Sequence, residues 1–297
     1  MAASECLTTD GKLGNDASIQ VKRVSIVIPA FNEAQRLPAS LKRIGRYVEE
    51  LEAQECPAFR ICEVILVDDG SSDDTVSVAR AFQQSFGILC VLALPENHGK
   101  GAAVRAGMLS ATGDIALFTD ADLSAPIDEM PKLINALDAA EVAIGSRAID
   151  RSLIESRQSR LRELAGITFN CLVRALTGVH LKDTQCGFKA FVLPQARAVF
   201  ELQRVEGFGF DPEILFLANR LGFLTREVPV RWAHDPRTKV NVLRDSLKMA
   251  RDLVRIRFDW FIGRYKPSAE RRSIRARDSR ELAGPVSTSP AERPSNT

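Results

Sequence analysis

The stretch IALFTDAD, residues 115–122, is an apolar run that ends in two carboxylates, Asp120 and Asp122. The apolar part is typical of a buried strand, and an unpaired charge inside a protein is costly. The two acids are therefore expected at an edge of a sheet, beside a cation, hydrogen-bond donors or water. Oxygen ligands two residues apart suit a hard ion such as Mg²⁺ or Mn²⁺. A turn that is merely rich in Asp is the alternative interpretation of this tripeptide taken alone.

Strand-like and helix-like segments alternate on both sides of this stretch. The expected strands cover residues 24–28, 63–67, 88–94, 115–118, 142–144 and 225–232, with a short strand inside 184–192. The expected helices cover residues 37–51, 75–86, 102–110, 131–139, 161–176, 212–221 and 243–261. This alternation predicts an α/β fold in which a mostly parallel sheet carries helices on both faces.

Length and composition exclude several classes of protein. The 297 residues allow one large domain or two small ones, and a formal net charge of +2 gives no reason to expect a nucleic-acid partner. The six cysteines lack metal-ligand spacing, so we expect reduced thiols. No apolar run approaches the roughly 18 residues of a membrane span, and the polar N-terminus is unlike a signal peptide. We expect a cytoplasmic protein whose residues 1–20 and 267–297 are disordered.

Polar residues gather where the predicted strands end. These ends are PAFNE (residues 29–33), DDGSSDD (68–74), TDAD (119–122) and GSR (145–147). Open parallel sheets bind ligands outside the carboxyl ends of their strands, so the four ends predict one site. Adjacent Asp68 and Asp69 repel each other without nearby donors, and they are suited to accept from ribose hydroxyls or a base N–H. Ser72 and Asp73 are explained equally well as a helix cap.

The stretch NHGKG, residues 97–101, superficially suggests a phosphate-binding loop. It lacks the spacing of a P-loop, so that interpretation is rejected. Its glycines are expected instead to let the start of a helix approach a ligand closely.

Taken together, these motifs resemble family 2 of the inverting glycosyltransferases, which share the nucleotide-sugar-binding fold called GT-A. The resemblance lies in VIPAFNE (27–33), VDDGSSDDT (67–75) and DAD (120–122). Two later stretches, GSR (145–147) and DTQCGFK (183–189), resemble the polyprenyl-phosphate hexosyltransferases. Within that branch the chain is more similar to dolichyl-phosphate glucosyltransferases than to mannosyltransferases. The similarity covers about residues 22–260.

The resemblance implies a role for individual residues. The implied donor-binding residues are Pro29, Phe31, Glu33, Asp69, Asp120 and Ala121; the implied metal ligands are Asp122 and Asp120; the implied catalytic residues are Asp122, Arg147, Asp183 and Lys239; and the implied acceptor-phosphate residues are Arg160, Arg237 and Lys239. Two positions depart from the pattern. Ser124 stands where the mannosyl relatives have a metal-binding Gln, and Phe31 stands where Tyr is usual.

The implied reaction is metal-dependent transfer of a hexose, glucose before others, from a nucleotide sugar to a polyprenyl phosphate. UDP-glucose is the expected donor, and GDP-mannose is the second choice. A phosphate acceptor is already ionised near neutral pH, so it needs cations that position it rather than a protein base. Besides the residues above, Arg231 offers such a cation. Asp183 is open to three roles: a residual base, an acid that orients basic side chains, or a structural acid that holds the turn before Gly187.

Residues 243–266 form a predicted basic amphipathic helix that follows a catalytic domain at 21–242. Its basic residues are Arg244, Lys248, Arg251, Arg255, Arg257, Arg264 and Lys266, against three acids. Such a helix can lie on anionic lipid, which predicts peripheral binding to a membrane surface. Packing against the catalytic domain, with a solvated charged face, is the other interpretation.

Two further functions remain open from the sequence. A soluble glycosyltransferase of the same fold would act on a sugar or small-molecule hydroxyl, and it would need a carboxylate base such as Asp183 or Asp211. A non-catalytic protein that binds a nucleotide sugar, or docks to a partner through the basic helix, is the alternative of another class. Ser124 favours that last interpretation, and the retained acids oppose it.

Overall fold

The computed structural model describes residues 21–156, 160–233 and 242–265. The strands are β1 (Lys22–Ala30), β2 (Phe59–Asp68), β3 (Leu89–Ala93), β4 (Ile115–Thr119), β5 (Val142–Ser146), β6 (Ile154–Ser156), β7 (Phe188–Val192), β8 (Thr225–Pro229) and β9 (Trp232–Ala233). The α-helices are α1 (Leu37–Glu52), α2 (Thr75–Gln83), α3 (Lys100–Ser110), α4 (Met130–Ala136), α5 (Arg160–Thr177), α6 (Arg197–Leu202), α7 (Phe210–Arg220) and α8 (Val242–Phe261).

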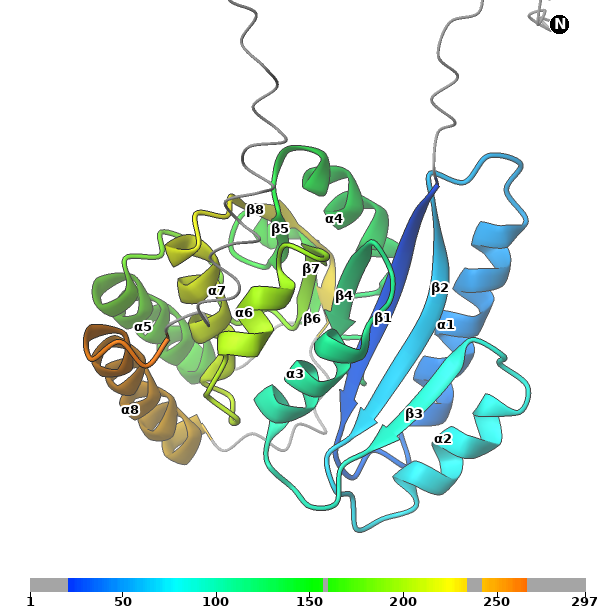
Figure 1. Ribbon diagram of the computed structural model, residues 1–297, viewed down its shortest axis with the longest axis horizontal. Helices are drawn as coiled ribbons and strands as arrows, with labels where there is room; N and C mark the ends of the chain where they lie inside the picture. The colour runs from blue at the N-terminus through cyan, green and yellow to red at the C-terminus, as the bar shows by residue number, and fades with distance from the viewer. Residues whose placement is uncertain (1–20, 157–159, 234–241, 266–297) are drawn as a thin grey trace, which may run out of the picture.

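A seven-stranded sheet, in the order β3-β2-β1-β4-β7-β5-β8, forms the centre of the protein (Figure 1). Strand β7 runs antiparallel to both of its neighbours, whereas the other strand pairs of this sheet are parallel. A short second sheet pairs β6 with β9. The prediction of a mostly parallel α/β fold is therefore confirmed.

Alternate residues of a strand point to opposite sides of the sheet, so the apolar strands place apolar side chains on both faces. Helices cover both faces. In β1, Ile26 and Ile28 join a core with α1, α2 and α4, whereas Val27 joins a second core with α3 and α5 to α8. Figure 1 shows α1 and α2 on one side of β1–β3 and α3 on the other. Strands β1, β2, β4, β5 and β7 are mostly buried on both faces, which explains why they read as largely apolar runs.

The amphipathic pattern predicted for the first helix is the pattern seen in α1. Leu37, Leu41 and Ile44 lie among its buried residues, as the helical spacing requires. Pro38 lies in the first turn, where its missing N–H costs no hydrogen bond within the helix.

Several elements differ from the sequence prediction, and helix α6 and strand β6 were not predicted. The predicted strand 225–232 is two strands, β8 and β9, which belong to different sheets. The short strand predicted inside 184–192 is β7, and its antiparallel insertion was not foreseen. Because Phe188 at the start of β7 pairs with Thr119 at the end of β4, the turn before β7 lies at the carboxyl edge of the parallel strands. That turn thereby joins the edge at which the polar strand ends were predicted to meet.

Several predictions fall outside the described residues. These are the predicted disorder of residues 1–20 and 267–297, and the predicted acceptor-phosphate roles of Arg237 and Lys239. Arg160 begins α5, but its side chain also lies outside the description. None of the described helices is long and apolar enough to cross a membrane.

Candidate active site

Asp69, at the end of β2, is the centre of a closed set of hydrogen bonds. Its side chain is buried and accepts from the Asn97 side chain at 2.9 Å and from the N–H groups of His98 and Gly99 at 2.9 and 2.8 Å. Burial raises the pKa of Asp69, and the two backbone hydrogen bonds oppose that rise. The loop after β3 is thus fastened to the end of β2.

Lys100 continues the same loop and connects it to the end of β4. Its Nζ lies 2.5 Å from Oδ1 of Asp120. Burial opposes the charge of Lys100, but the carboxylates of Asp120 and then Asp211 raise the pKa of its ammonium above the ordinary value. The acids after β2 and β4 therefore meet at one edge of the sheet, as predicted. Sequence analysis missed Lys100, because residues 97–101 were considered only for their P-loop spacing and their glycines.

Asp122 is the less tightly paired of the two acids that follow β4. Its side chain is 22% exposed, it accepts from the Ser124 N–H at 3.0 Å, and the nearest ion-pair contact from Arg36 is 3.8 Å long. Burial, followed by the neighbouring Asp120 carboxylate, raises the pKa of Asp122. Leu123 has a φ of +50°, a backbone conformation that is strained for such a residue. A cation placed between the two acids would relieve their repulsion.

The donor set at this edge fits a divalent ion that is shared with a ligand. Within the described residues no three His, Cys, Asp or Glu side chains gather as a metal site, so Asp120 and Asp122 would need outside oxygens to complete a shell. Gly187, in the turn before β7, leaves room for the Asp120 carboxylate. A Cβ at that position would lie 2.1 Å from Oδ2 of Asp120. Carboxylate oxygens suit Mg²⁺ or Mn²⁺.

The residues predicted to line a nucleoside pocket lie at the end of β1 and just beyond it. Pro29 is buried, whereas the Phe31 ring is 38% exposed at the rim. Glu33 is buried and receives a 2.5 Å hydrogen bond from Nε of Arg36. Ala121 is buried. The Phe31 ring is therefore partly exposed at this rim, and Glu33 holds the arginine that faces Asp122.

The loops after β1 and β2 are joined by Asn32, which has a φ of +54°. Its side-chain oxygen accepts from the Ser72 N–H at 2.8 Å, and its own N–H donates to the Ser71 hydroxyl at 2.8 Å. Asp73 accepts from the Thr75 N–H at 3.0 Å, which agrees with the capping role considered for it. By contrast, Oδ1 of buried Asp68 finds no hydrogen-bond partner in the described part of the chain. A buried acceptor without a partner is uncommon in folded proteins.

Arg147, at the end of β5, is held by a bidentate ion pair with Asp183. Its Nε and Nη2 donate to the two carboxylate oxygens at 2.7 and 2.8 Å, and its backbone N–H adds a bond of 3.0 Å. Burial opposes the charge of Asp183, but the guanidinium of Arg147 lowers the pKa of Asp183 to about 2. Asp183 also accepts from the Gln185 N–H. The carboxylate thus both orients Arg147 and holds the turn, two of the three roles considered for it.

A buried ion pair behind Asp120 was also missed. Lys189 of β7 is fully buried, pairs with Asp211 and donates to the Cys186 carbonyl at 2.6 Å. Burial raises the pKa of Asp211, and Lys189 opposes that rise. A lysine inside the apolar run FKAFV, residues 188–192, was the available signal, because a buried ammonium requires a partner.

Arg231, a predicted acceptor-phosphate cation, lies at the start of the small sheet. Its Nε donates to Oε1 of buried Glu129 at 2.7 Å. The side chain nevertheless remains 43% exposed. Arg231 is thus anchored to Glu129 through Nε and its backbone N–H, and its side chain is partly exposed.

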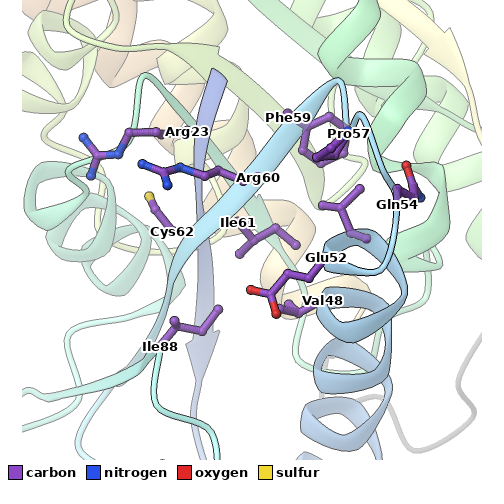
Figure 2. A pocket seen from close by; sticks show the side chains of 11 residues that line it. Arg23, Val48, Glu52, Gln54, Pro57, Phe59, Arg60, Ile61, Cys62 and Ile88 are labelled. Atoms are coloured by element: carbon purple, nitrogen blue, oxygen red, sulfur yellow. The ribbon is translucent and has the colours of Figure 1, made fainter. Parts of the chain in front are cut away.

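A hollow with a volume of about 610 Å³ lies at the opposite edge of the sheet (Figure 2). It is lined by residues at the starts of β1 and β2, among them Arg23, Arg60 and Cys62, and by the end of α1 near Glu52. Figure 2 shows Arg60 and Cys62 on one side of β2 and Ile61 on the other. The charged groups described above lie at the carboxyl edge, so this hollow is remote from them.

Comparison with known proteins agrees with this geometry. Residues 25–192 match the profile of Glycosyl transferase family 2. The chain is 40% identical over 253 residues to a dolichyl-phosphate beta-glucosyltransferase of Drosophila melanogaster, covering 82% of this chain and 77% of the relative. It is 34% identical to the human protein of the same name, covering 82% and 78%.

A solved structure shares the fold. Glucosyl-3-phosphoglycerate synthase from Mycobacterium tuberculosis, in complex with Mn²⁺ and UDP-glucose, gives a TM-score of 0.56 at 23% identity, covering 86% of this chain and 82% of that one. This likeness bears on the fold alone and confirms the prediction of a GT-A-type architecture. The chain belongs to glycosyl transferase family 2.

Proposed function

We propose that this protein transfers glucose from UDP-glucose to a dolichyl-type polyprenyl phosphate, with inversion at the sugar. The names of the relatives in fly and human support the acceptor and the sugar. The UDP-glucose bound in the mycobacterial neighbour supports the donor. GDP-mannose is the second candidate donor.

The main support for a donor site at this edge is that residues 97–100 contact both Asp69 and Asp120. The Gly99 N–H donates to Asp69, and Lys100 pairs with Asp120. A nucleotide sugar laid along this edge would place its base against Phe31, its ribose near Asp69 and its diphosphate near Asp122. Base stacking on Phe31 needs only the ring, so it survives the absence of a phenolic hydroxyl.

Asp122 and Asp120 are the residues that would hold a divalent ion, Mg²⁺ or Mn²⁺. When bound, such an ion would neutralise charge that develops on the departing diphosphate. The protein's own contribution is to hold Asp120 by Lys100 and to keep Asp122 partly open. The Mn²⁺ in the mycobacterial neighbour supports a divalent ion without choosing between metals.

The acceptor is argued from the state of the candidate bases. A hydroxyl acceptor needs a carboxylate that can take its proton. Asp183 has a pKa of about 2 and is paired with Arg147, and Asp211 is buried and paired with Lys189. Neither is available as a base, which favours a phosphate acceptor over the soluble enzyme that acts on a hydroxyl.

The proposed transfer then needs no protein base. An oxygen of the acceptor phosphate forms a bond to the anomeric carbon, and the bond from that carbon to the diphosphate breaks. The electron pair leaves with UDP. Two anions must approach each other, so we propose that Arg147, fixed by Asp183, with Arg160, Arg237 and Lys239, offsets their repulsion.

The outer face of α8 supports the proposed contact with a membrane surface. Leu247, Val254, Phe258 and Phe261 share one face of the helix by their spacing and are 74%, 59%, 57% and 86% exposed. The opposite face is buried on α5 and α7. In Figure 1 this helix lies at the outside of the protein, beside α5.

Exposed Arg251 and Arg255 lie beside this outer apolar face. Each basic group near an anionic lipid surface contributes about 1 kcal/mol, so the attraction is reversible. Packing on the domain and contact with lipid are thus compatible, since they use opposite faces of one helix. We propose peripheral binding to the cytoplasmic face of a membrane.

The experiment that tests the function is a panel of nucleotide sugars supplied with a short polyprenyl phosphate and Mg²⁺ or Mn²⁺, with products read by mass spectrometry. We expect polyprenyl phosphate glucose from UDP-glucose and a smaller yield from GDP-mannose. Donor binding without any product would favour the non-catalytic interpretation. Glycosylation of a sugar hydroxyl, with polyprenyl phosphate ignored, would favour the soluble enzyme.

A further inference from the structure

The linker between α6 and α7, residues 203–209, packs against the start of α3. The Gln203 side chain donates to the Gly101 carbonyl at 2.8 Å. The Ala102 N–H donates to the Glu206 carbonyl at 3.1 Å. Two hydrogen bonds of opposite direction thus join the linker to the first turn of this helix.

The start of α3 in turn holds both halves of the candidate donor site. The Gly99 N–H donates to Asp69, and Lys100 pairs with Asp120. Gly99 has a φ of +116°, and a Cβ there would lie 2.6 Å from the Glu206 carbonyl of the linker. The position of the linker therefore limits where this loop can lie.

A buried carboxylate on α7 fixes the linker. Glu213 is fully buried and accepts three hydrogen bonds: from the N–H groups of Arg204 and Val205 at 3.0 and 2.8 Å, and from the Tyr265 hydroxyl at 2.6 Å. The first two donors belong to the linker, and the third belongs to the turn that follows α8. One side chain thus joins the linker to the end of the last described helix.

A second contact strengthens this junction. Nη2 of Arg204 donates to the Arg264 carbonyl at 2.9 Å, and the guanidinium lies 5.9 Å from the Tyr265 ring centre. The Tyr265 side chain is buried. The end of α8 therefore reaches the linker through a hydroxyl, a carbonyl and a ring.

We propose that Glu213 and Tyr265 are positioning residues for the donor site. They act through the linker and the start of α3, which supplies the N–H groups bound by Asp69 and the ammonium that faces Asp120. The inference rests on the proposed nucleotide-sugar donor. It adds that donor affinity depends on how the end of α8 is seated, although α8 contributes no residue to the acidic edge described above.

The charge of Glu213 supplies a readout that loss of stability would not mimic. The groups that face it are the Tyr265 hydroxyl, the backbone of Arg204 and Val205, and the guanidinium of Arg255 on α8. Burial raises the pKa of Glu213 to about 7, and the hydrogen bonds oppose that rise. Protonation places a hydrogen on an oxygen that otherwise accepts. Its hold on the linker should therefore weaken as the pH falls through about 7.

The test uses the full chain with Glu213→Gln and Tyr265→Phe, and measures the affinity for UDP-glucose with Mn²⁺ by calorimetry. The UDP-glucose diphosphate does not titrate near neutral pH. We expect Tyr265→Phe to weaken binding about fivefold and Glu213→Gln about tenfold, as expected for one and for more than one hydrogen bond. Wild-type affinity should fall below pH 7, and that fall should be absent from Glu213→Gln.

Two matched variants separate positioning from stability. Glu63→Gln alters another carboxylate that accepts three hydrogen bonds, from Ser25 and Thr112, at the opposite edge of the sheet. Tyr47→Phe removes the hydroxyl of a buried tyrosine on α1. Both should leave donor affinity unchanged, whatever they do to the melting temperature.

Wild-type affinity and pH dependence in both Glu213→Gln and Tyr265→Phe would overturn the inference while leaving the donor site intact. Equal weakening by Glu63→Gln and Tyr47→Phe would also overturn it, because the effect would then be one of general stability. Failure of the wild-type protein to bind UDP-glucose would overturn the proposed function, and this inference with it.

Discussion

Asp122 and Asp183 lie at the same edge of the sheet but differ in their partners. Asp183 is buried against Arg147, and its pKa is lowered to about 2. Asp122 is partly exposed, receives a distant contact from Arg36, and its pKa is raised. The Asp183 carboxylate is paired with a cation of the protein. The Asp122 carboxylate remains suited to a cation that arrives with a ligand. A carboxylate without a close cationic partner is therefore a better indicator of a ligand site than a carboxylate that is already paired.

The largest effect is expected at the open acid. Asp122→Ala should lower transfer by about a thousandfold or more, because a group that stabilises the departing diphosphate is lost. Transfer rate and donor affinity are measured separately, with and without added Mn²⁺. Full activity of the variant without added metal would rule out the role of Asp122 and remove the contrast with Asp183.

Substitution of Asp183 should lower transfer less than substitution of Asp122, and it should also lower the stability of the fold. Asp183→Asn leaves the Arg147 guanidinium without its charged partner, so the free energy of unfolding should fall by about 3 kcal/mol. Misplacement of Arg147 should lower transfer about a hundredfold, chiefly through the polyprenyl phosphate rather than UDP-glucose. Denaturant unfolding and separate kinetic constants for the two substrates check this. Retention of full activity would mean that Arg147 does not serve the acceptor.

The next prediction concerns the exposed apolar face of α8 and its proposed contact with lipid. Phe258→Asp combined with Phe261→Asp should abolish pelleting with anionic liposomes, because burial of each ring contributes about 2 kcal/mol. Leu224→Asp, which alters an apolar residue that is 62% exposed outside α8, is the control. Binding of UDP-glucose should be unchanged in both variants. No pelleting of the wild-type chain would count against lipid contact.

An effect on stability alone concerns Glu213, whose pKa in the folded protein is about 7 against an ordinary value of 4.5. The folded state binds the proton more tightly than the unfolded state. The stability that this provides is therefore complete below about pH 4.5 and is lost as the pH rises through 7. Relative to Glu213→Gln, the wild-type protein should lose up to about 3 kcal/mol between pH 5 and 8, measured by denaturant unfolding. A constant difference across this range would contradict the assigned burial of the charge.

Most of the fold could be predicted because its signals are local. Apolar runs, helical spacing and the polar strand ends give the sheet, its helices and the edge at which Asp69 and Asp120 meet. The antiparallel β7 could not be predicted in the same way, since its place between β4 and β5 depends on pairing across distant parts of the chain. That insertion brings Gly187 against Asp120 and buries Lys189 beside Asp211.

The site residues also differ in whether a local sequence pattern identifies them. Asp122 and Arg147 follow strands directly, so the sequence alone identifies them as candidates. Lys100 pairs with an acid 20 positions later, and Glu213 holds a linker and a tyrosine 52 positions later. Such pairs carry no local pattern, because the fold rather than the spacing brings them together. The glycines at 99 and 187 were the visible signs of close approach.

The most direct test of the open acid is titration of Mn²⁺, followed by electron paramagnetic resonance, with and without UDP. Because Asp120 and Asp122 supply too few ligands by themselves, we expect weak binding of the ion alone, much tighter binding with UDP, and loss of that enhancement in Asp122→Asn. Mn²⁺ binding that is independent of UDP, or unchanged in Asp122→Asn, would contradict a metal-bound sugar nucleotide at this edge.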